Sequence, residues 1–330
     1  MGIREIAKQL VAPGKGILAA DESTTTIAKR FEKAQIENTE DNRRLYRQLL
    51  FTTQGMENYI SGVILYDETL RQSTTDGVPF PTLLREKGVL PGIKVDQGVQ
   101  PFGTKQETLT KGLEGLDERL KEYRELGAAF TKWRGVITIG DGVPTDDCIR
   151  ENAKALAQFA LKTQRAGLVP IVEPEVLMDG NHTLERCSEV TTNTLTAVFE
   201  ELQNAGVDLE GMLLKPNMVI AGSELQPSSP KEDVSKMTIA CFKKVVPEQV
   251  PGIVFLSGGQ SDEQAAINLN EMNKTKGLPW QLSFSFGRGL QQAALKVLTG
   301  DLLSTEKQTQ AQEAFLHSAL QCSRAREGSL

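Results

Sequence analysis

The strongest constraint on the fold is a regular alternation of short β-rich runs with longer segments of helical period. The chain contains eight such runs, at residues 16–20, 62–66, 92–95, 130–137, 169–172, 212–214, 253–256 and 281–286. This alternation is typical of βα units built around a parallel sheet. Eight units favour a closed barrel over an open doubly wound sheet. No Pro-, Gly- or Ser-rich linker divides the chain, so we expect one α/β domain over residues 1–330, a (β/α)8 TIM barrel.

Start and stop signals for helices lie between the runs. Thr145 precedes an amphipathic stretch at 153–166 that stops at Gly167, which gives a capping residue at one end and a C-terminal glycine at the other. Ser261 opens a second helix by the same reasoning, and residues 38–54 form a third with dense charge on one face.

The segment before the first run argues against a dinucleotide-binding fold. No GxGxxG follows that run, although a six-stranded dinucleotide fold requires it there. Residues 12–16 resemble a phosphate-binding loop, but they lack its leading glycine and the following Ser or Thr. We therefore interpret this segment as a turn.

Composition excludes several classes of function. The 37 basic and 43 acidic residues give a net charge of −6, and no polybasic segment is present, so we expect no nucleic-acid partner. The N-terminus lacks the apolar region of a signal peptide, and no apolar run approaches ~18 residues. These observations predict a cytoplasmic protein with no membrane partner.

Histidine and cysteine usage argues against a metal centre. His182 and His317 are the only imidazoles and have no chelating spacing, so neither a His-bound metal nor a Ser-His-Asp triad is expected. The four cysteines are far apart and form no CxxC pair, and we predict that all are buried and reduced: Cys148, Cys187, Cys241 and Cys322. No metal and no cofactor is predicted.

Charged side chains gather at the carboxyl ends of the runs. In chain order the residues are Asp21, Lys94, Asp96, Lys132, Arg134, Glu173, Glu175, Lys215 and Arg288. Side chains two residues apart on a strand share a face, so Lys94/Asp96, Lys132/Arg134 and Glu173/Glu175 are predicted same-face pairs. One such charge alone is typical of a solvated rim. Charges or glycine-rich ends after seven of eight runs instead indicate an active site in a barrel mouth.

Two glycine-rich segments predict a phosphate site in that mouth. They are Ser257-Gly258-Gly259 after the seventh run and Ser285-Phe286-Gly287-Arg288 after the eighth. Barrels bind phosphate at this position through backbone N–H groups. Arg288 would add a charge-assisted fork.

Three lysines at run ends, without metal ligands, suggest that one is a nucleophile that forms an imine with a ketone. Lys215 adjoins an apolar run, and Lys132 is the expected neighbouring cation; burial and a nearby cation both favour a neutral, reactive amine. Glu173 is a candidate for moving protons during imine formation and cleavage. Asp21 is a candidate base for a substrate hydroxyl.

The residues alone leave other functions open. A phosphosugar isomerase would use Glu173 as its base and need no imine, which leaves the three lysines without a role. A non-catalytic scaffold would need no acid–base set. A metal-dependent aldolase is disfavoured by the two histidines.

Seven collinear motifs over most of residues 1–300 carry a family resemblance. They are LAADES at 18–23, GIKVD at 92–96, KWR at 132–134, VEPE at 172–175, LLKPNM at 213–218, LSGGQS at 256–261 and FSFGR at 284–288. Through them the chain resembles the class I, Schiff-base-forming fructose-bisphosphate aldolases. The resemblance implies a metal-independent reversible cleavage of fructose 1,6-bisphosphate to dihydroxyacetone phosphate and glyceraldehyde 3-phosphate.

The resemblance also implies the roles of the site residues. It implies that Lys215 forms the Schiff base, that Glu173 acts as a general acid and base, and that Asp21 takes the proton of the C4 hydroxyl. It also implies that Lys132 and Glu175 support the charges of these groups in the barrel mouth. The residues implied for the C1 phosphate are Ser257, Gly258, Gly259, Ser285, Gly287 and Arg288. Those implied for the other phosphate are Ser23, Thr26, Arg30, Arg43 and Lys94, and Arg134 is expected near the substrate. Phosphosugar substrates and a homotetramer are implied as partners.

The sequence departs from the family pattern in two places. The family's Ser-Thr-Gly-Ser reads Ser23-Thr24-Thr25-Thr26 here, so its last hydroxyl carries an added methyl and a glycine is lost. We expect residues from about 320 to 330 to form a short C-terminal tail. The animal enzymes carry a C-terminal tyrosine that affects proton exchange, whereas the last tyrosine here is Tyr123. We expect either another group to do that work or the step to be slower.

Overall fold

Eight parallel strands close into a barrel at the centre of the molecule. The computed structural model describes residues 1–103 and 106–330. Neighbouring strands follow the order β1-β10-β9-β8-β7-β6-β3-β2, and β1 closes the barrel against β2. The barrel strands are β1 (Gly16–Ala20), β2 (Ile60–Leu65), β3 (Leu90–Lys94), β6 (Phe130–Ile137), β7 (Val169–Val176), β8 (Leu213–Leu214), β9 (Gly252–Phe255) and β10 (Gln281–Phe286). The predicted (β/α)8 barrel is confirmed.

Strand bounds match the predicted runs closely, with one informative exception. The runs at 16–20, 130–137 and 281–286 coincide with β1, β6 and β10. The run at 169–172 is shorter than the strand it predicts, because β7 continues in register with β6 as far as Val176. Glu173 and Glu175 therefore project from within a strand rather than from a loop. Backbone pairing with β6 fixes their positions.

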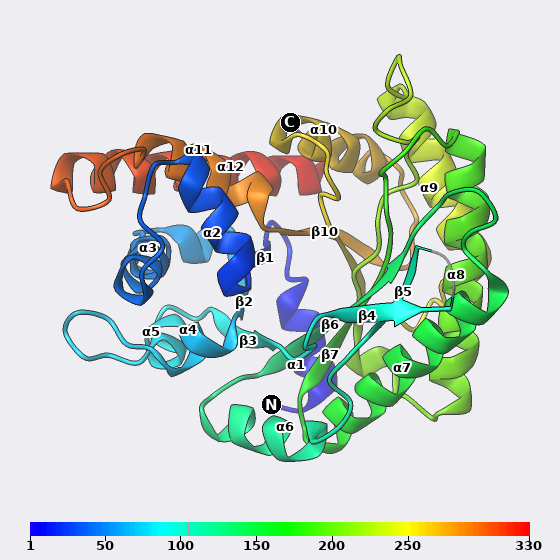
Figure 1. Ribbon diagram of the computed structural model, residues 1–330, viewed down its shortest axis with the longest axis horizontal. Helices are drawn as coiled ribbons and strands as arrows, with labels where there is room; N and C mark the ends of the chain where they lie inside the picture. Colours follow the sequence, from blue (N-terminus) through cyan, green and yellow to red (C-terminus); the bar gives the residue numbers. More distant parts are fainter. Residues whose placement is uncertain (104–105) are drawn as a thin grey trace.

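Helices surround the barrel (Figure 1). The helices are α1 (Ile3–Leu10), α2 (Thr24–Lys33), α3 (Glu40–Thr52), α4 (Asp67–Arg71), α5 (Phe80–Glu86), α6 (Leu116–Glu125), α7 (Asp146–Arg165), α8 (Leu184–Asn204), α9 (Lys231–Val245), α10 (Asp262–Asn273), α11 (Arg288–Val297) and α12 (Thr305–Glu327), with 3-10 turns η1 (Met56–Asn58) and η2 (Leu209–Gly211). The capping predictions hold, since the Thr145 and Ser261 hydroxyls accept from backbone N–H groups in the first turns of α7 and α10. Helix α7 begins well before the predicted stretch.

An antiparallel hairpin interrupts the βα rhythm and was not predicted. Strand β4 (Val99–Phe102) pairs with β5 (Glu107–Thr110). The hairpin docks on the barrel because the Thr110 hydroxyl donates to the Arg134 carbonyl and the Glu107 carboxylate accepts from Thr145. These contacts join segments distant in sequence, so local patterns carry no signal for them.

The last helix packs against the barrel and the first helices. Gln312 of α12 donates to the Leu49 carbonyl of α3, and in Figure 1 the red helix α12 runs across the molecule with orange α11 beside it. Residues 320–327 of the expected tail lie in α12. Cys322 and Arg326 are buried there, and Arg326 donates to the Val11 carbonyl.

The inward faces of the strands change from apolar to charged along the barrel. Ile6 and Leu10 of α1 pack with Phe130, Ile171 and Leu213 in one apolar cluster inside the barrel. Two residues further along the same strand faces come Lys132, Glu173 and Lys215. The barrel thus has an apolar floor closed by α1, and its charged layer begins directly above.

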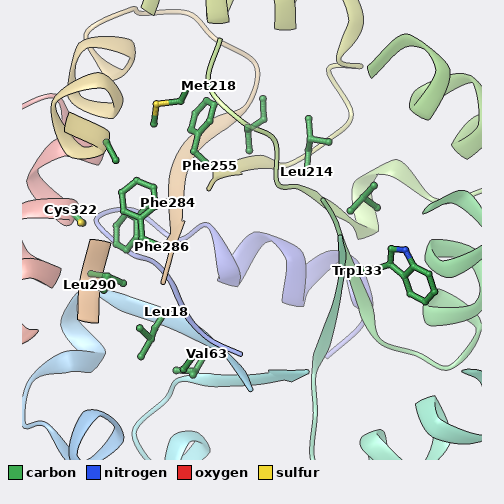
Figure 2. Packing of buried hydrophobic residues seen from close by; sticks show 14 of the residues in the cluster. Leu18, Val63, Trp133, Leu214, Met218, Phe255, Phe284, Phe286, Leu290 and Cys322 are labelled. Carbon is green, nitrogen blue, oxygen red and sulfur yellow. The ribbon is translucent and has the colours of Figure 1, made fainter. Parts of the chain in front are cut away.

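The outward faces pack under the helices (Figure 2). Phe284 and Phe286 lie 5.6 Å apart between ring centroids, and Cys322 of α12 lies beside them in the figure. Trp133 points outward and stacks on Phe159 of α7. All four cysteines are free and buried, as predicted.

We predict that Gly92→Ala destabilises the protein by about 1–3 kcal/mol, because added volume overpacks a filled core. A Cβ at Gly92 would lie 2.3 Å from the Phe130 ring, inside the barrel floor. Urea unfolding of the variant and the native chain measures the difference. Gly2→Ala is the control, since nothing lies within 4 Å of a Cβ there. Equal unfolding midpoints for Gly92→Ala and the native chain would contradict the prediction.

Candidate active site

Lys132 lies at the centre of a buried ionic cluster in the barrel mouth. Its Nζ is 2.7 Å from Asp21 Oδ2, 3.2 Å from Glu173 Oε2 and 3.9 Å from Asp96 Oδ2. Asp21 follows β1, Asp96 follows β3, and Lys132 and Glu173 project from β6 and β7. The barrel therefore brings together residues that the sequence placed at the ends of separate runs.

Lys215 reaches the same cluster from the end of β8. Its Nζ lies 3.0 Å from Glu173 Oε1, its side chain is about 5% exposed, and its backbone N–H donates to the Val172 carbonyl. Glu173 is thus shared, with one carboxylate oxygen facing Lys215 and the other facing Lys132. This arrangement places a proton acceptor in contact with the lysine predicted to be the nucleophile.

The charges of the cluster determine its protonation. Burial alone would raise the pKa of Asp21, but the ammonium groups of Lys132, Lys215 and Lys94 lower it well below its usual range. Burial would likewise raise the pKa of Glu173, yet Lys132 and Lys215 lower it. Burial opposes the charge on Lys132, while Asp21 and Glu173 raise its pKa. Near neutral pH the cluster therefore holds carboxylates and a fixed ammonium group.

Two further ion pairs border the cluster. Lys94 Nζ lies 2.6 Å from Asp96 Oδ1, and the Arg134 guanidinium pairs with Glu175. Burial would lower the pKa of Arg134, but Glu175 and Glu173 raise it. All three predicted same-face pairs point into the mouth, as expected from the two-residue spacing.

A cavity of about 710 Å³ opens beside Lys215 and is strongly basic. Six basic residues and one acidic residue contribute to its wall: Lys29, Arg30, Lys33, Lys215, Arg288, Lys296 and Glu175. The predicted phosphate residues Ser257, Gly258, Gly259, Ser285 and Gly287 also line it. A cavity of this charge suits a phosphorylated ligand.

Two glycines and a serine form a cradle in that cavity. Gly258 and Gly259 have φ of 51° and 84°, in the left-handed region, and a Cβ at Gly259 would lie 2.7 Å from Met178 Sδ. Ser285 Oγ is buried and has no hydrogen-bond partner among the described residues. Arg288 opens α11 at the same edge. The cradle offers backbone and hydroxyl groups suited to phosphate oxygens.

A second cavity of about 830 Å³ lies on the other side of the mouth. Ser23, Lys94 and Arg134 line it, and Thr26 lines both cavities. The Ser23 hydroxyl lies 3.1 Å from that of Thr26 and also accepts from its backbone N–H as the cap of α2. Thr26 thus joins the two cavities.

Two residues predicted for the second phosphate are placed elsewhere. Arg30 lines the first cavity, with the cradle and Arg288. Arg43 makes a bidentate pair with Glu68, with N–O distances of 2.8 and 2.6 Å, and lines neither cavity. These positions follow from how α2 and α3 pack on the barrel.

The structure adds residues that the sequence reasoning did not select. Lys29, Lys33, Lys296 and Gln291 line the first cavity, and Glu22 lies behind it, where it accepts from Gln291. Positions 29 and 33 are one helical turn apart, so the basic residues in 29–33, within the first helical segment after the first run, were an available signal. Glu22 and Gln291 had no such signal, because their contact joins opposite ends of the chain.

The histidines lie outside the ionic cluster. His182 follows β7 in a loop and is partly buried, and His317 is exposed on α12. Among residues 1–103 and 106–330, no group of three or more His, Cys, Asp or Glu side chains is arranged to hold a metal ion. No helix in those two stretches is both long and apolar enough to cross a membrane.

Comparisons with known proteins agree with the resemblance. The model of a family described as fructose-bisphosphate aldolase class-I matches residues 2–330. A probable fructose-bisphosphate aldolase class 1 of Xanthomonas campestris pv. campestris is 55% identical over 301 residues, which cover 91% of this chain and 90% of that protein. The cytosolic fructose-bisphosphate aldolase 5 of Arabidopsis thaliana is 54% identical over 312 residues, covering 94% and 86%.

The fold has a solved counterpart. The fructose-bisphosphate aldolase of Plasmodium falciparum, solved in complex with TRAP and a small-molecule inhibitor, is similar to this chain with a TM-score of 0.96. The two chains are 48% identical, and the match covers 99% of this chain and 94% of the other.

Proposed function

The chain belongs to the class-I fructose-bisphosphate aldolase family, and we propose that Lys215 is the residue that forms its Schiff base. Enzymes of this class cleave fructose 1,6-bisphosphate reversibly to dihydroxyacetone phosphate and glyceraldehyde 3-phosphate through a lysine imine. One observation carries the assignment: Lys215 is buried, contacts the Glu173 carboxylate at 3.0 Å and opens into the basic cavity.

Glu173 serves imine formation in this proposal. Its carboxylate takes a proton from the Lys215 ammonium, and the neutral amine adds to the C2 carbonyl of the substrate. A second proton passes from the nitrogen to the new C2 alkoxide, which becomes the hydroxyl of a carbinolamine. Glu173 then returns that proton to the C2 hydroxyl, which leaves as water. Lys132, 3.2 Å from the other oxygen of Glu173, keeps the carboxylate oriented and compensates its charge.

Asp21 serves the cleavage step. It takes the proton of the C4 hydroxyl as the C3–C4 bond breaks, and the bonding electrons move into the iminium. Glyceraldehyde 3-phosphate leaves, the enamine is protonated at C3, and water hydrolyses the imine to release dihydroxyacetone phosphate. The low pKa of Asp21 keeps it ionised but makes it a weak base, so the step depends on the hydroxyl being held against it.

The two cavities suit the two phosphates. We assign the C1 phosphate to the cradle of residues 257–259 with Ser285, Gly287, Arg288 and Arg30. We assign the second phosphate to Ser23, Thr26 and Lys94 in the other cavity, with Arg134 beside the substrate chain. Glu175 holds Arg134 there, and Arg43, which pairs with Glu68, takes no part because it lines neither cavity.

Family membership supports two broader proposals. We propose that the chain assembles as a homo-oligomer, a tetramer, and acts in the cytoplasm, where relatives such as the Arabidopsis enzyme are named as cytosolic. The phosphosugars are its small-molecule partners.

Borohydride trapping tests the assignment of Lys215. Reduction in the presence of dihydroxyacetone phosphate converts an imine into a stable amine, and we expect one adduct, on the peptide that contains Lys215. The same reduction without dihydroxyacetone phosphate is the control and should leave that peptide unmodified. An adduct on another lysine would overturn the assignment, and no adduct in an active enzyme would overturn the imine.

A further inference from the structure

A buried charge network lies directly behind the first cavity. Glu22, next to Asp21 after β1, accepts hydrogen bonds from two guanidinium groups: Arg30 of α2 on Oε1 and Arg47 of α3 on Oε2. The side chains of Glu22 and Arg47 are 5% and 3% exposed. Arg30 is 26% exposed and lines the cavity. The network therefore reaches the ligand space through one charged member, Arg30.

Gln291 of α11 holds the carboxylate of Glu22 in place. Its Nε2 donates to Glu22 Oε1 at 2.9 Å and to the Ala19 carbonyl at 2.7 Å. The Oε1 atom of Gln291 accepts from the Arg47 guanidinium at 3.1 Å and from the Tyr46 hydroxyl at 3.2 Å. Both the nitrogen and the oxygen of the Gln291 amide are thus hydrogen-bonded, and each carboxylate oxygen of Glu22 accepts from a different arginine.

The network carries one positive charge more than it can compensate. Two guanidinium groups share one carboxylate, which leaves a net charge of +1. Among the described residues, no other carboxylate lies within ion-pair distance of Arg30 or Arg47. The half-buried Asp262 carboxylate acts on Arg30 only from further away. The uncompensated charge is exposed where Arg30 faces the cavity, beside Arg288 and the glycine cradle.

We propose that Arg47 is a positioning residue for substrate binding that acts through Glu22 and Arg30. Arg47 takes up half of the Glu22 carboxylate, so Arg30 keeps a charge for the C1 phosphate, which supplies the missing negative charge. Without Arg47, Glu22 would neutralise Arg30 completely and draw its guanidinium back from the cavity. This inference rests on the proposed function, because it takes the ligand facing Arg30 to be a substrate phosphate.

Three variants separate charge from packing. Arg47→Met brings the network to zero charge, and we expect the KM for fructose 1,6-bisphosphate and the inhibition constant of inorganic phosphate to rise about tenfold, with kcat within about twofold. Arg47→Lys keeps the charge and should restore most of the affinity. Glu22→Gln combined with Arg47→Met returns the network to +1 and should bring both constants back to within about threefold of the native values.

A purely structural role for Arg47 predicts another pattern. Each lost polar contact would then weaken the site further, so the double variant would bind phosphate no better than Arg47→Met. Native constants in folded Arg47→Met, or no recovery in the double variant, would overturn the proposal. If Arg47→Met fails to fold, the double variant still decides, because its one remaining charge, on Arg30, is partly exposed to the cavity; a tenfold rise in its KM would count against the proposal.

Borohydride trapping keeps this proposal distinct from the assignment of Lys215. At saturating dihydroxyacetone phosphate, all variants should still form the adduct on Lys215. If the adduct forms but the variants bind phosphate and substrate as the native chain does, the role of Arg47 is rejected and the assignment of Lys215 stands. Absence of the adduct in the native chain would reject the catalytic assignment, whatever the affinities of the variants.

Discussion

Lys215→Met is expected to lower kcat by ~10⁴-fold or more while the protein still folds. The imine supplies the electron sink for C–C cleavage, and neither Lys132 nor Lys94 replaces it, since each is held by a carboxylate at 2.7 or 2.6 Å. Methionine keeps an unbranched apolar stem in the buried position, and Glu173 retains Lys132 as its counterion. Cleavage of fructose 1,6-bisphosphate and circular dichroism measure activity and folding.

Lys94→Met is the matched control for this variant. It removes another lysine of the same mouth, which we assign to the second phosphate rather than to the imine. We expect it to raise KM and to retain the borohydride adduct. Turnover by folded Lys215→Met at the native rate, or loss of the adduct only in Lys94→Met, would reject the roles assigned to these two lysines.

Glu173→Gln is expected to lower kcat/KM by roughly 10²- to 10⁴-fold, the usual contribution of a general acid–base group. The amide keeps the size of the side chain but no longer takes the proton from the Lys215 ammonium, 3.0 Å away in the native chain. Because the slow step becomes imine formation, we also expect slower accumulation of the borohydride adduct. Single-turnover trapping at fixed times measures this rate.

Glu175→Gln serves as the comparison for that variant. Glu175 lies two residues further along the same face of β7, but its carboxylate pairs with Arg134 and is not in ion-pair contact with Lys215. We expect a smaller loss, mainly in KM, since Arg134 borders the second cavity. Equal losses of trapping rate in the two variants would contradict a specific proton-transfer role for Glu173.

Much of the charged layer in the barrel mouth was predictable because strand periodicity is local. The spacing of Lys132 and Arg134, and of Glu173 and Glu175, requires only that each segment be extended for side chains to share a face. The positions of the glycine cradle after the seventh and eighth runs follow from the count of runs. The extension of β7 to Val176 was not predicted, because it depends on pairing with β6, which is distant in sequence. The β4–β5 hairpin was not predicted either; its strands are close in sequence, but its docking on the barrel depends on distant contacts with Arg134 and Thr145.

The residues implied for phosphate binding show more clearly what the sequence could not predict. The family resemblance implied both Arg30 and Arg43 for the second phosphate, yet Arg30 faces the first cavity and Arg43 is paired with Glu68. Which arginine reaches the ligand depends on the packing angles of α2 and α3. The contact of Gln291 with Glu22 likewise exists only because β10 closes next to β1.

The sequence by itself determined the elements, the faces of the strands and the chemical types gathered at one end of the barrel. Those properties follow from backbone geometry and the order of residues, which act over a few positions. Only the tertiary structure decided the partners: Glu173 between Lys215 and Lys132, and Glu22 between Arg30 and Arg47. Ion pairs form where closure of the barrel brings charges within about 3 Å and removes water, and no local pattern encodes that distance.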